Sequence, residues 1–347
     1  MSTSLHSGST TSDVLIVGVG PAAVAAALTA TANGLSAVLV ARRPRKIKES
    51  HHLLQSFHPD VRCLMTEMQA LHVLENSLAS IFRSVTINDE EYSLSPETSD
   101  NGFHVHRSLF DDGLLALALD RGVHLIYSDT LRLISSQDRL LGLRLDDDKE
   151  VRARFTLDGS GSSRVLARTM RIRQRYYSPK LLVQTGVIRE PGRDWTHRKT
   201  TFSPRPQGWQ WTTPSFGGFM TWTALLLPKD RWNEELVALR ERSEHGSVNS
   251  ADASWRLSRP VAKPGMLLIG EAAGHLDPAW GRGVLSALSS GRRAISTILS
   301  ITAEPAMEGW HEADYDQWFV NGFEDAAEIL AQAYEERGID MHIRSHF

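Results

Sequence analysis

Short apolar runs alternate with longer stretches of helical spacing in the first part of the chain. Residues 13–17 and 36–40 are apolar and rich in β-branched side chains, which indicates two buried strands. The alanine-rich stretch 21–33 between them predicts a helix, which Gly34 would end. Strand, glycine turn, helix and strand make one βαβ unit, so we expect a parallel sheet to begin here.

The pattern changes further along the chain. Residues 110–120 and 283–301 have the apolar spacing of helices, whereas 123–127 and 266–269 have that of buried strands. Residues 176–227 instead alternate between apolar and polar positions, with Pro and Gly between the segments, which predicts an antiparallel sheet. The order of elements therefore predicts an α/β domain that an antiparallel-sheet domain interrupts.

This order also predicts where the two domains begin and end. The parallel-sheet domain would be discontinuous and comprise residues 13–85, 104–170 and 260–303. The inserted domain would comprise residues 86–103 and 171–259. A helical tail with acidic faces would follow at residues 304–347.

Composition narrows the class of protein. The 347 residues suit one large domain or two intimately joined domains, and 41% hydrophobic and 23% charged residues are ordinary for a globular chain. The net charge of −3 gives no attraction to nucleic acid or an anionic membrane, and no apolar run approaches the roughly 20 residues that cross a bilayer. Residues 1–12 lack the apolar segment of a signal peptide and are expected to be disordered. The lone cysteine, Cys63, is expected to be buried, and a single thiol fits a cytoplasmic location.

A glycine-rich turn joins the first strand to the first helix. Its pattern is Gly18-x-Gly20-x-x-Ala23, with Pro21 and Ala22 at the start of the helix. In a dinucleotide-binding turn the glycines let the backbone approach a pyrophosphate, to which the helix N-terminus offers free N–H groups. We expect these five residues to bind the phosphates of NAD or FAD, between which the motif alone does not choose.

The end of the second strand departs from that motif. An acid that binds the ribose normally follows about 20 residues after the turn. Ala41 occupies this position and Arg42 follows it. Arg42 is therefore expected to bind a phosphate of the dinucleotide, unless the basic stretch 42–48 is only a solvated loop.

Residues 268–283, with the sequence LIGEAAGHLDPAWGRG, are the most informative stretch of the chain. They resemble the "GDAA…DP…GxG" segment of FAD-dependent aromatic hydroxylases, tryptophan-halogenase-like enzymes and geranylgeranyl-reductase-like proteins. The resemblance implies FAD as the cofactor and a Rossmann-like, three-layer FAD-binding domain with an inserted antiparallel-sheet substrate domain. It also implies flavin contacts by Gly270, Glu271, Pro278, Gly281 and Gly283.

The resemblance gives these residues separate roles. Glu271, which replaces the family's usual Asp, would bind the ribityl chain, and Pro278 would lie over the isoalloxazine ring. The later glycines open a helix whose N-terminus would stabilise negative charge on the flavin. His275 lies in the same loop, where we expect it to act on the ring as a base or hydrogen-bond partner, or else to bond the backbone.

Three shorter segments resemble other parts of the same family. Arg107 lies in a segment like the family's "R…F/L-D" and would contact the cofactor. Asp158 and Gly159 begin a "DGSG" turn, which would return to the nucleotide. Glu49 lies in an element like the family's "GES", next to the flavin, and is a candidate catalytic residue.

Two tryptophans in the segment GWQWTTP are the candidates for substrate contact. The segment resembles the "G-W-x-W-x-x-P" of the halogenase-like and reductase-like branches. Because side chains alternate along a strand, Trp209 and Trp211 lie on one face, where they would wall a flavin or aromatic pocket or else fill a core. We expect both to contact the substrate and Trp211 to take part in catalysis.

Other candidate groups are weaker. A halogenase needs a lysine that carries hypohalous acid to the substrate, and Lys46 and Lys48 are candidates outside the family's lysine context. Histidine pairs at 51–52 and 104–106 invite a metal site, but no acid at metal-ligand spacing supports one, so none is expected.

The resemblance implies an FAD-dependent monooxygenase. Reduced flavin would react with dioxygen, and the C4a-hydroperoxide would hydroxylate an electron-rich aromatic or indole substrate. That substrate would be a small metabolite or a group on a carrier or protein, as in the maturases of tryptophylquinone enzymes. Electrons would come from NAD(P)H or a separate flavin reductase, because no second nucleotide-binding turn is visible. A flavin-dependent halogenase, a reductase of carbon–carbon double bonds and a non-catalytic binding module remain alternatives, and the oligomeric state is open.

Overall fold

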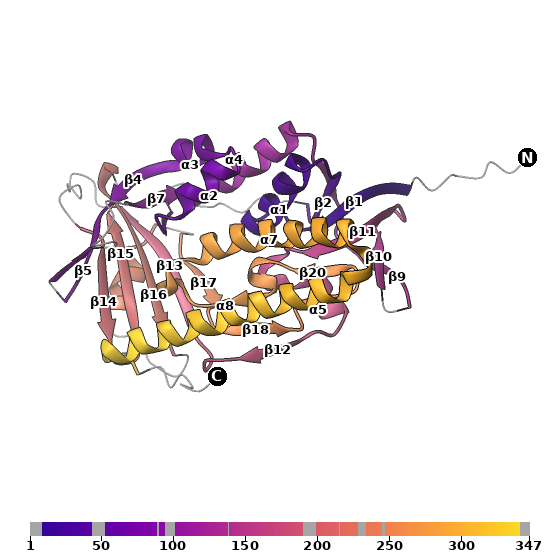
Figure 1. Cartoon of the computed structure of the whole chain (residues 1–347). Helices are drawn as coiled ribbons and strands as arrows, with labels where there is room; N and C mark the ends of the chain where they lie inside the picture. Colours follow the sequence, from indigo (N-terminus) through magenta and orange to yellow (C-terminus); the bar gives the residue numbers. More distant parts are fainter. Residues whose placement is uncertain are drawn as a thin grey trace, which may run out of the picture.

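The computed structural model of the chain describes residues 9–43, 53–88, 90–93, 101–137, 139–189, 199–214, 216–227, 234–244 and 247–340. Figure 1 shows two parts side by side, a mainly parallel sheet with its helices and an antiparallel sheet. The long helix α8 (Glu308–Glu336) runs along both. The expected α/β fold class, with a separate antiparallel sheet, is confirmed.

The strand β1 (Ser9–Val17) lies at the centre of the parallel part. It pairs in parallel with β2 (Ala37–Ala41) on one side and β11 (Glu150–Asp158) on the other. Beyond these, β8 (His124–Tyr127) and β20 (Met266–Leu268) extend the parallel arrangement. Three antiparallel strands complete the sheet: β9 (Arg132–Ser136), β10 (Arg139–Arg144) and β19 (Ala262–Lys263).

The first strand begins earlier than expected. Residues 9–12 were assigned to a disordered lead-in, yet Ser9 to Ser12 pair in register with Glu150 to Ala153 of β11. Strand pairing uses backbone N–H and C=O groups, so the polar side chains of this stretch do not prevent it.

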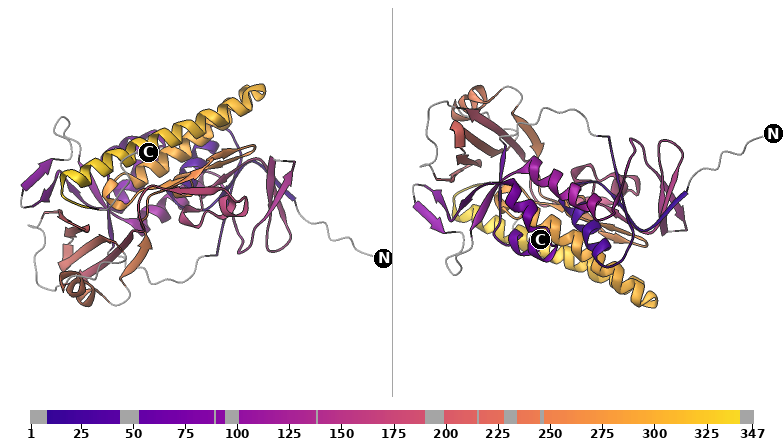
Figure 2. Two further views of the ribbon diagram at one scale, coloured as in Figure 1. Left: turned by 90° about the horizontal axis from the view of Figure 1, so that it is seen from below. Right: turned by 90° about the horizontal axis from the view of Figure 1, so that it is seen from above.

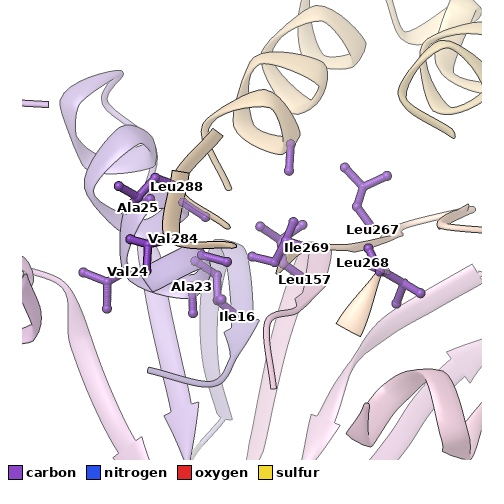
Figure 3. Packing of buried hydrophobic residues seen from close by; sticks show 14 of the residues in the cluster. Ile16, Ala23, Val24, Ala25, Leu157, Leu267, Leu268, Ile269, Val284 and Leu288 are labelled. Carbon is purple, nitrogen blue, oxygen red and sulfur yellow. The ribbon is translucent and has the colours of Figure 1, made fainter. Parts of the chain in front are cut away.

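Two helices cross closely over this sheet. The helix α1 (Pro21–Ala32) is buried along most of its length, because the sheet covers one side and α7 (Gly283–Ala303) covers the other. A Cβ on Gly291 of α7 would lie 2.2 Å from the carbonyl oxygen of Ala22, so only glycine permits this crossing. Figure 3 shows the apolar contacts, in which Ile16 of β1 lies next to Ala23 of α1 and Leu157 of β11 lies next to Ile269.

The second part is a seven-stranded sheet. In spatial order its strands are β17 (Asn249–Asp252), β13 (Leu182–Arg189), β16 (Phe219–Leu226), β15 (Gly208–Pro214), β14 (Thr201–Arg205), β5 (Ser84–Ile87) and β6 (Glu90–Ser93). All neighbours pair antiparallel except β14 and β5. The helix α6 (Glu234–Arg242) packs on one face through an apolar cluster around Trp222.

Two small antiparallel sheets and four shorter helices complete the core. One sheet contains β3 (Leu54–Phe57), β7 (Gly102–His106) and β4 (Leu78–Phe82), and the other contains β12 (Arg173–Tyr176), β18 (Arg256–Arg259) and β21 (Gly274–His275). The helices are α2 (Val61–Glu67), α3 (Leu71–Ser77), α4 (Arg107–Asp120) and α5 (Val165–Thr169).

The last described helix, α8, packs against α7 (Figure 2). Tyr315, Phe323 and Tyr334 of α8 are buried, so this helix packs into the core. None of the described helices combines the length and the apolar character needed to cross a membrane.

Candidate functional site

The turn between β1 and α1 requires glycine at its first position. Gly18 has a φ of +118°, and a Cβ there would lie 2.3 Å from the carbonyl oxygen of Gly159. Its N–H donates to the carbonyl of Val40 at 2.9 Å, which holds the turn at the carboxyl ends of β1 and β2. In a parallel α/β sheet this edge is where ligands bind.

The second glycine of the turn borders open space. Gly20 is the N-cap residue of α1, and apart from its chain neighbours no described residue has an atom within 4 Å of the position that its Cβ would take. Pro21 and Ala22 follow in the first turn of the helix, whose first N–H groups have no intrahelical acceptor. Nearby, a Cβ on Gly159 would lie 3.0 Å from the Cβ of Ala23, so these small residues let β11 approach α1.

The two arginines after β2 differ in their partners. Arg43 forms ion pairs with Asp129 at 2.7 Å and Asp146 at 3.0 Å. Arg42 is exposed, and no ion pair of the described residues includes it. Ala41 is 8% exposed, and its carbonyl accepts from Ser128 N–H at 2.9 Å.

The segment 270–283 approaches the same turn from the other side. Gly270 has a φ of +58°, and its Cβ would lie 2.8 Å from the Cβ of Ala22. Gly281 has a φ of +68°, and Gly283 begins α7 with no atom from another part of the described chain within 4 Å of its Cβ position. Pro278 between them is exposed. The N-termini of α1 and α7 and an open loop thus lie around one region.

An acid and a histidine in this segment face each other. His275 Nδ1 lies 3.5 Å from Glu271 Oε1, and this contact lowers the pKa of Glu271, with further help from the charges of Arg256 and Arg107. The side chain of Glu271 is 52% exposed and remains accessible to a ligand. The Nε2 atom of His275 is buried and has no hydrogen-bond partner among the described residues.

Arg107 begins α4 and already has partners within the chain. Its guanidinium donates to both carboxylate oxygens of Asp111, at 2.9 and 2.8 Å, and to Gln55 Oε1 at 2.6 Å. The side chain is 32% exposed, so one edge remains available. These contacts fix its orientation at the junction of β3, β7 and α4.

Asp158 has a structural contact that the sequence reading did not foresee. It is fully buried, and its carboxylate accepts from the N–H groups of Leu166 and Ala167 at 2.9 Å and from the hydroxyl of Ser160 at 2.6 Å. It therefore caps the N-terminus of α5. The expected cofactor contact is replaced by this capping role, because the DGSG turn directs the side chain inward.

The two tryptophans of GWQWTTP lie on the same face of β15, as expected, but at different depths. Trp209 is 2% exposed, so the expectation that it contacts a substrate is not met. Trp211 is half-buried, donates from Nε1 to the Thr213 hydroxyl at 3.0 Å and lies 6.0 Å from the ring of Phe202. Alternation along a strand predicts a shared face, whereas depth depends on distant elements.

Two residues that the sequence reading did not single out, Asp277 and Tyr334, explain the burial of Trp209. Trp209 Nε1 donates to the hydroxyl of Tyr334 at 2.6 Å, and that hydroxyl donates to the carboxylate of Asp277 at 2.8 Å. Trp255 Nε1 donates to the same carboxylate at 2.6 Å. The acid beside Pro278 was the only local signal of this network, since its partners are distant in sequence.

Some of the residues expected at the site lie outside the described residues, and one residue is exposed where burial was expected. Glu49, Lys46 and Lys48 lie outside the described residues. Cys63 was expected to be buried but is exposed on α2, one turn from Glu67, with which it forms a hydrogen bond. Within the described residues, no group of three or more His, Cys, Asp and Glu side chains is arranged for a metal ion.

Comparisons with family models, with protein sequences and with solved structures each find proteins that are similar to this chain. A family model described as tryptophan halogenase matches residues 60–338. A digeranylgeranylglycerophospholipid reductase of Thermoplasma acidophilum is 23% identical, over 96% of this chain and 86% of the reductase. A 1H-pyrrole-2-carbonyl-[peptidyl-carrier protein] brominase of Pseudoalteromonas luteoviolacea is 26% identical, over 92% of this chain and 84% of the brominase. The solved structure of QhpG, a peptidyl tryptophan dihydroxylase essential for tryptophylquinone cofactor biogenesis, has a TM-score of 0.69 at 19% identity, over 91% of this chain and 74% of that one.

Proposed function

Because the chain belongs to the tryptophan halogenase family and is an FAD-dependent oxidoreductase, we propose that it is a monooxygenase that hydroxylates an electron-rich aromatic or indole ring. The observation that carries this proposal is the face of the antiparallel sheet around Trp211. The half-buried indole, opposite the partly exposed Thr223 of β16, suits a flat ring that carries a polar group.

The residues present fit FAD. Among the described residues, the space at Gly20 and the N-terminus of α1 suit a pyrophosphate, with Pro21, Ala22, Ala23 and the exposed Arg42 around it. Glu271 would accept hydrogen bonds from the ribityl hydroxyls. On the same proposal, Gly270, Pro278, Gly281 and Gly283 would surround the flavin, with Arg107 contributing its open edge. Gly159 would act indirectly, through the close approach of β11 to α1.

Bound FAD would supply the activation of dioxygen and the transfer of one oxygen atom, and the residues of this chain would position the reactants. Trp211 would hold the ring by stacking and exclude water from one side of it. The buried Nε2 of His275, which has no partner among the described residues, would bond the cofactor or the substrate. Glu49 would belong to the family's catalytic element, and its role is proposed from the sequence alone because it lies outside the described residues.

Halogenation is the second candidate, and the brominase relative favours it. The lysines argue against it. No lysine occurs from residue 49 to residue 148, the segment that supplies α2, α3, β4 and β7. Lys149, Lys180 and Lys199 each pair with an acid on the surface. If this chain were a halogenase, its catalytic lysine would have to lie outside the described residues or belong to none of these three ion pairs.

Reduction of carbon–carbon double bonds is a third candidate, which the archaeal reductase supports. A prenyl chain needs an extended apolar surface. Opposite Trp211, the partly exposed Thr223 and its hydrogen-bonded neighbour Thr185 place polar hydroxyls where that surface would be required. We therefore favour an aromatic substrate.

The relatives also suggest how the substrate is presented. The brominase name specifies a ring on a peptidyl-carrier protein, and the dihydroxylase name specifies a peptidyl tryptophan. On the proposed function, the ring of this enzyme's substrate is likewise attached to a carrier or a protein, with a small free aromatic compound as the alternative. NAD(P)H or a separate flavin reductase would supply the electrons.

One assay separates these candidates. The purified protein is loaded with FAD, reduced by NADPH with a flavin reductase, and given indole, a tryptophan-containing peptide, a carrier-bound pyrrole or a prenyl lipid, with and without bromide and with and without dioxygen. Mass spectrometry of the product decides: one added oxygen that depends on dioxygen supports the proposal. Bromide incorporation would establish the second candidate, and turnover of a prenyl lipid without oxygen would establish the third.

A further inference from the structure

Four buried side chains from distant parts of the sequence form one hydrogen-bonded network. Trp209 donates to Tyr334 at 2.6 Å, Tyr334 donates to Asp277 at 2.8 Å, and Trp255 donates to Asp277 at 2.6 Å. The exposed fractions of these four residues lie between 0 and 2%. Trp209 is 125 residues from Tyr334, and Tyr334 is 57 residues from Asp277.

The direction of each bond in this network is fixed. An indole nitrogen only donates, so the hydroxyl of Tyr334 accepts from Trp209 and must give its single proton to Asp277. The carboxylate also accepts from the N–H of Ala279 at 2.9 Å. No ion pair of the described residues includes Asp277, and burial raises the pKa of this acid. Neutral donors therefore stabilise the carboxylate, and hydrogen bonds to a charged group are the stronger kind.

The two ends of the network lie in the two parts of the site. Trp209 lies two residues before Trp211 on the same face of β15. Asp277 directly precedes Pro278 and caps the short helix η4 (Pro278–Trp280) in the proposed flavin loop, residues 277–283. Tyr334 between them belongs to α8, which is part of neither segment.

We propose that Tyr334 is a positioning residue, through which α8 couples the substrate wall at Trp211 to the proposed flavin loop. The inference rests on the proposed placement of FAD at residues 277–283. Its consequence is that the affinity for FAD depends on Trp209, a buried residue of the antiparallel sheet. Such coupling is reciprocal, so a ligand against Trp211 also changes the hold of the loop on the flavin.

Two pairs of variants of the full chain test this coupling. Trp209→Phe and Tyr334→Phe remove single bonds of the network. Trp222→Phe removes the bond of another buried sheet tryptophan to Ser243 (2.8 Å), and Tyr177→Phe removes a tyrosine–carboxylate bond to Glu324 of α8 (2.6 Å). Each control removes the same type of hydrogen bond as one of the two test variants, but neither control residue belongs to the network. The Kd for FAD is measured by fluorescence titration, with thermal unfolding of the FAD-free protein alongside.

The coupling predicts a specific pattern of affinities. Trp209→Phe and Tyr334→Phe raise the Kd for FAD by about tenfold, and the double variant is no weaker than Tyr334→Phe alone, because both changes break one chain of bonds. The two controls lower the unfolding temperature comparably but leave the Kd within about twofold. An equal rise in all four variants, an additive double variant, or no rise in Trp209→Phe would overturn the inference.

The outcome is separate from that of the proposed function. If the protein binds FAD but adds no oxygen to any ring, the monooxygenase proposal fails while the pattern of Kd values still decides the coupling. If oxygen insertion is observed and Trp209→Phe binds FAD normally, the coupling fails alone. Where Tyr334→Phe does not fold, Trp209→Phe compared with Trp222→Phe carries the test.

Discussion

The carbonyl oxygen of Gly159 lies 2.3 Å from the point where any other residue at position 18 would place its Cβ. This contact joins the first turn of the chain to the end of β11, about 140 residues later in the sequence. Gly20, two residues on, has no atom of another described residue within 4 Å of its Cβ position, its chain neighbours aside. The fold thus requires glycine at the first position of the motif, whereas a Cβ at the second position would clash with none of the described residues.

Alanine at position 18 should therefore lower the stability of the fold, whereas alanine at position 20 should weaken the binding of FAD. Gly18→Ala combines a positive φ with a steric clash, and we expect the free energy of unfolding to fall by about 3 kcal/mol or more. Gly20→Ala should unfold like the wild type but bind FAD about tenfold more weakly, since a methyl group would fill the space proposed for the pyrophosphate. Urea unfolding and FAD titration measure the two effects, and a Gly20→Ala protein with normal FAD affinity would contradict the proposed phosphate site.

Glu271 offers a test of the ribityl contact. Glu271→Gln keeps the shape of the side chain but loses the charge, so we expect the Kd for FAD to rise about tenfold, as for the loss of a hydrogen bond to a charged group. Glu271→Asp, which restores the family's usual acid, should stay within about threefold of the wild type. Identical Kd values for the wild type and Glu271→Gln, from fluorescence titration at neutral pH, would remove Glu271 from the proposed site.

His104 predicts how stability changes with pH. Its Nδ1 lies 3.1 Å from the Ser56 hydroxyl and its Nε2 lies 2.8 Å from the Thr200 hydroxyl, and burial lowers its pKa from 6.5 to about 3. Below pH 6.5 the unfolded chain takes up a proton at this residue and the folded protein does not. The free energy of unfolding should therefore fall, by up to about 1.4 kcal/mol per pH unit between pH 6.5 and pH 3.

Urea unfolding at pH 7 and pH 5 checks this prediction. The difference between the two pH values should shrink by about 2 kcal/mol in His104→Gln, because the variant lacks the group that titrates. His124→Gln, which changes an exposed histidine, is the control and should keep the wild-type difference. If His104→Gln keeps the full difference, the acid sensitivity originates elsewhere.

Trp211 should affect the substrate and not the cofactor. Trp211→Ala removes the proposed wall of the ring pocket, and we expect the KM of the ring substrate to rise about tenfold while the Kd for FAD stays unchanged. Trp211→Phe keeps an aromatic face and should recover most of the affinity. Steady-state kinetics with the substrate identified by mass spectrometry measure both, and a rise in the Kd for FAD in Trp211→Ala would place this residue on the cofactor instead.

Local patterns in the sequence predicted the part of the fold that depends on neighbouring residues. The βαβ unit and the glycine turn follow from apolar spacing and from the conformations that Gly18 and Gly34 permit, and both have positive φ in the structure. The early start of β1 at Ser9 could not be predicted, because backbone pairing with β11 decides it.

The site was predicted less completely, and the reason is distance in sequence. Asp158 was recognised as part of a turn, but its burial and its bonds to Leu166 and Ala167 depend on how α5 packs. Trp209 was expected beside a substrate, but it is buried and donates a hydrogen bond to Tyr334 of α8, which follows 125 residues later in the sequence. A pattern of alternating residues specifies a face of a strand, and it carries no information about what packs on that face.

The position of α8 also has a consequence for the order in which the protein is made. This helix follows every other described element in the chain, and Tyr334 lies near its end. A ribosome therefore completes both sheets and the segment around Asp277 before it makes the residue that joins Trp209 to that acid. We therefore expect a chain arrested within α8 before Tyr334 to lack the hydrogen bonds that this residue makes with Trp209 and Asp277.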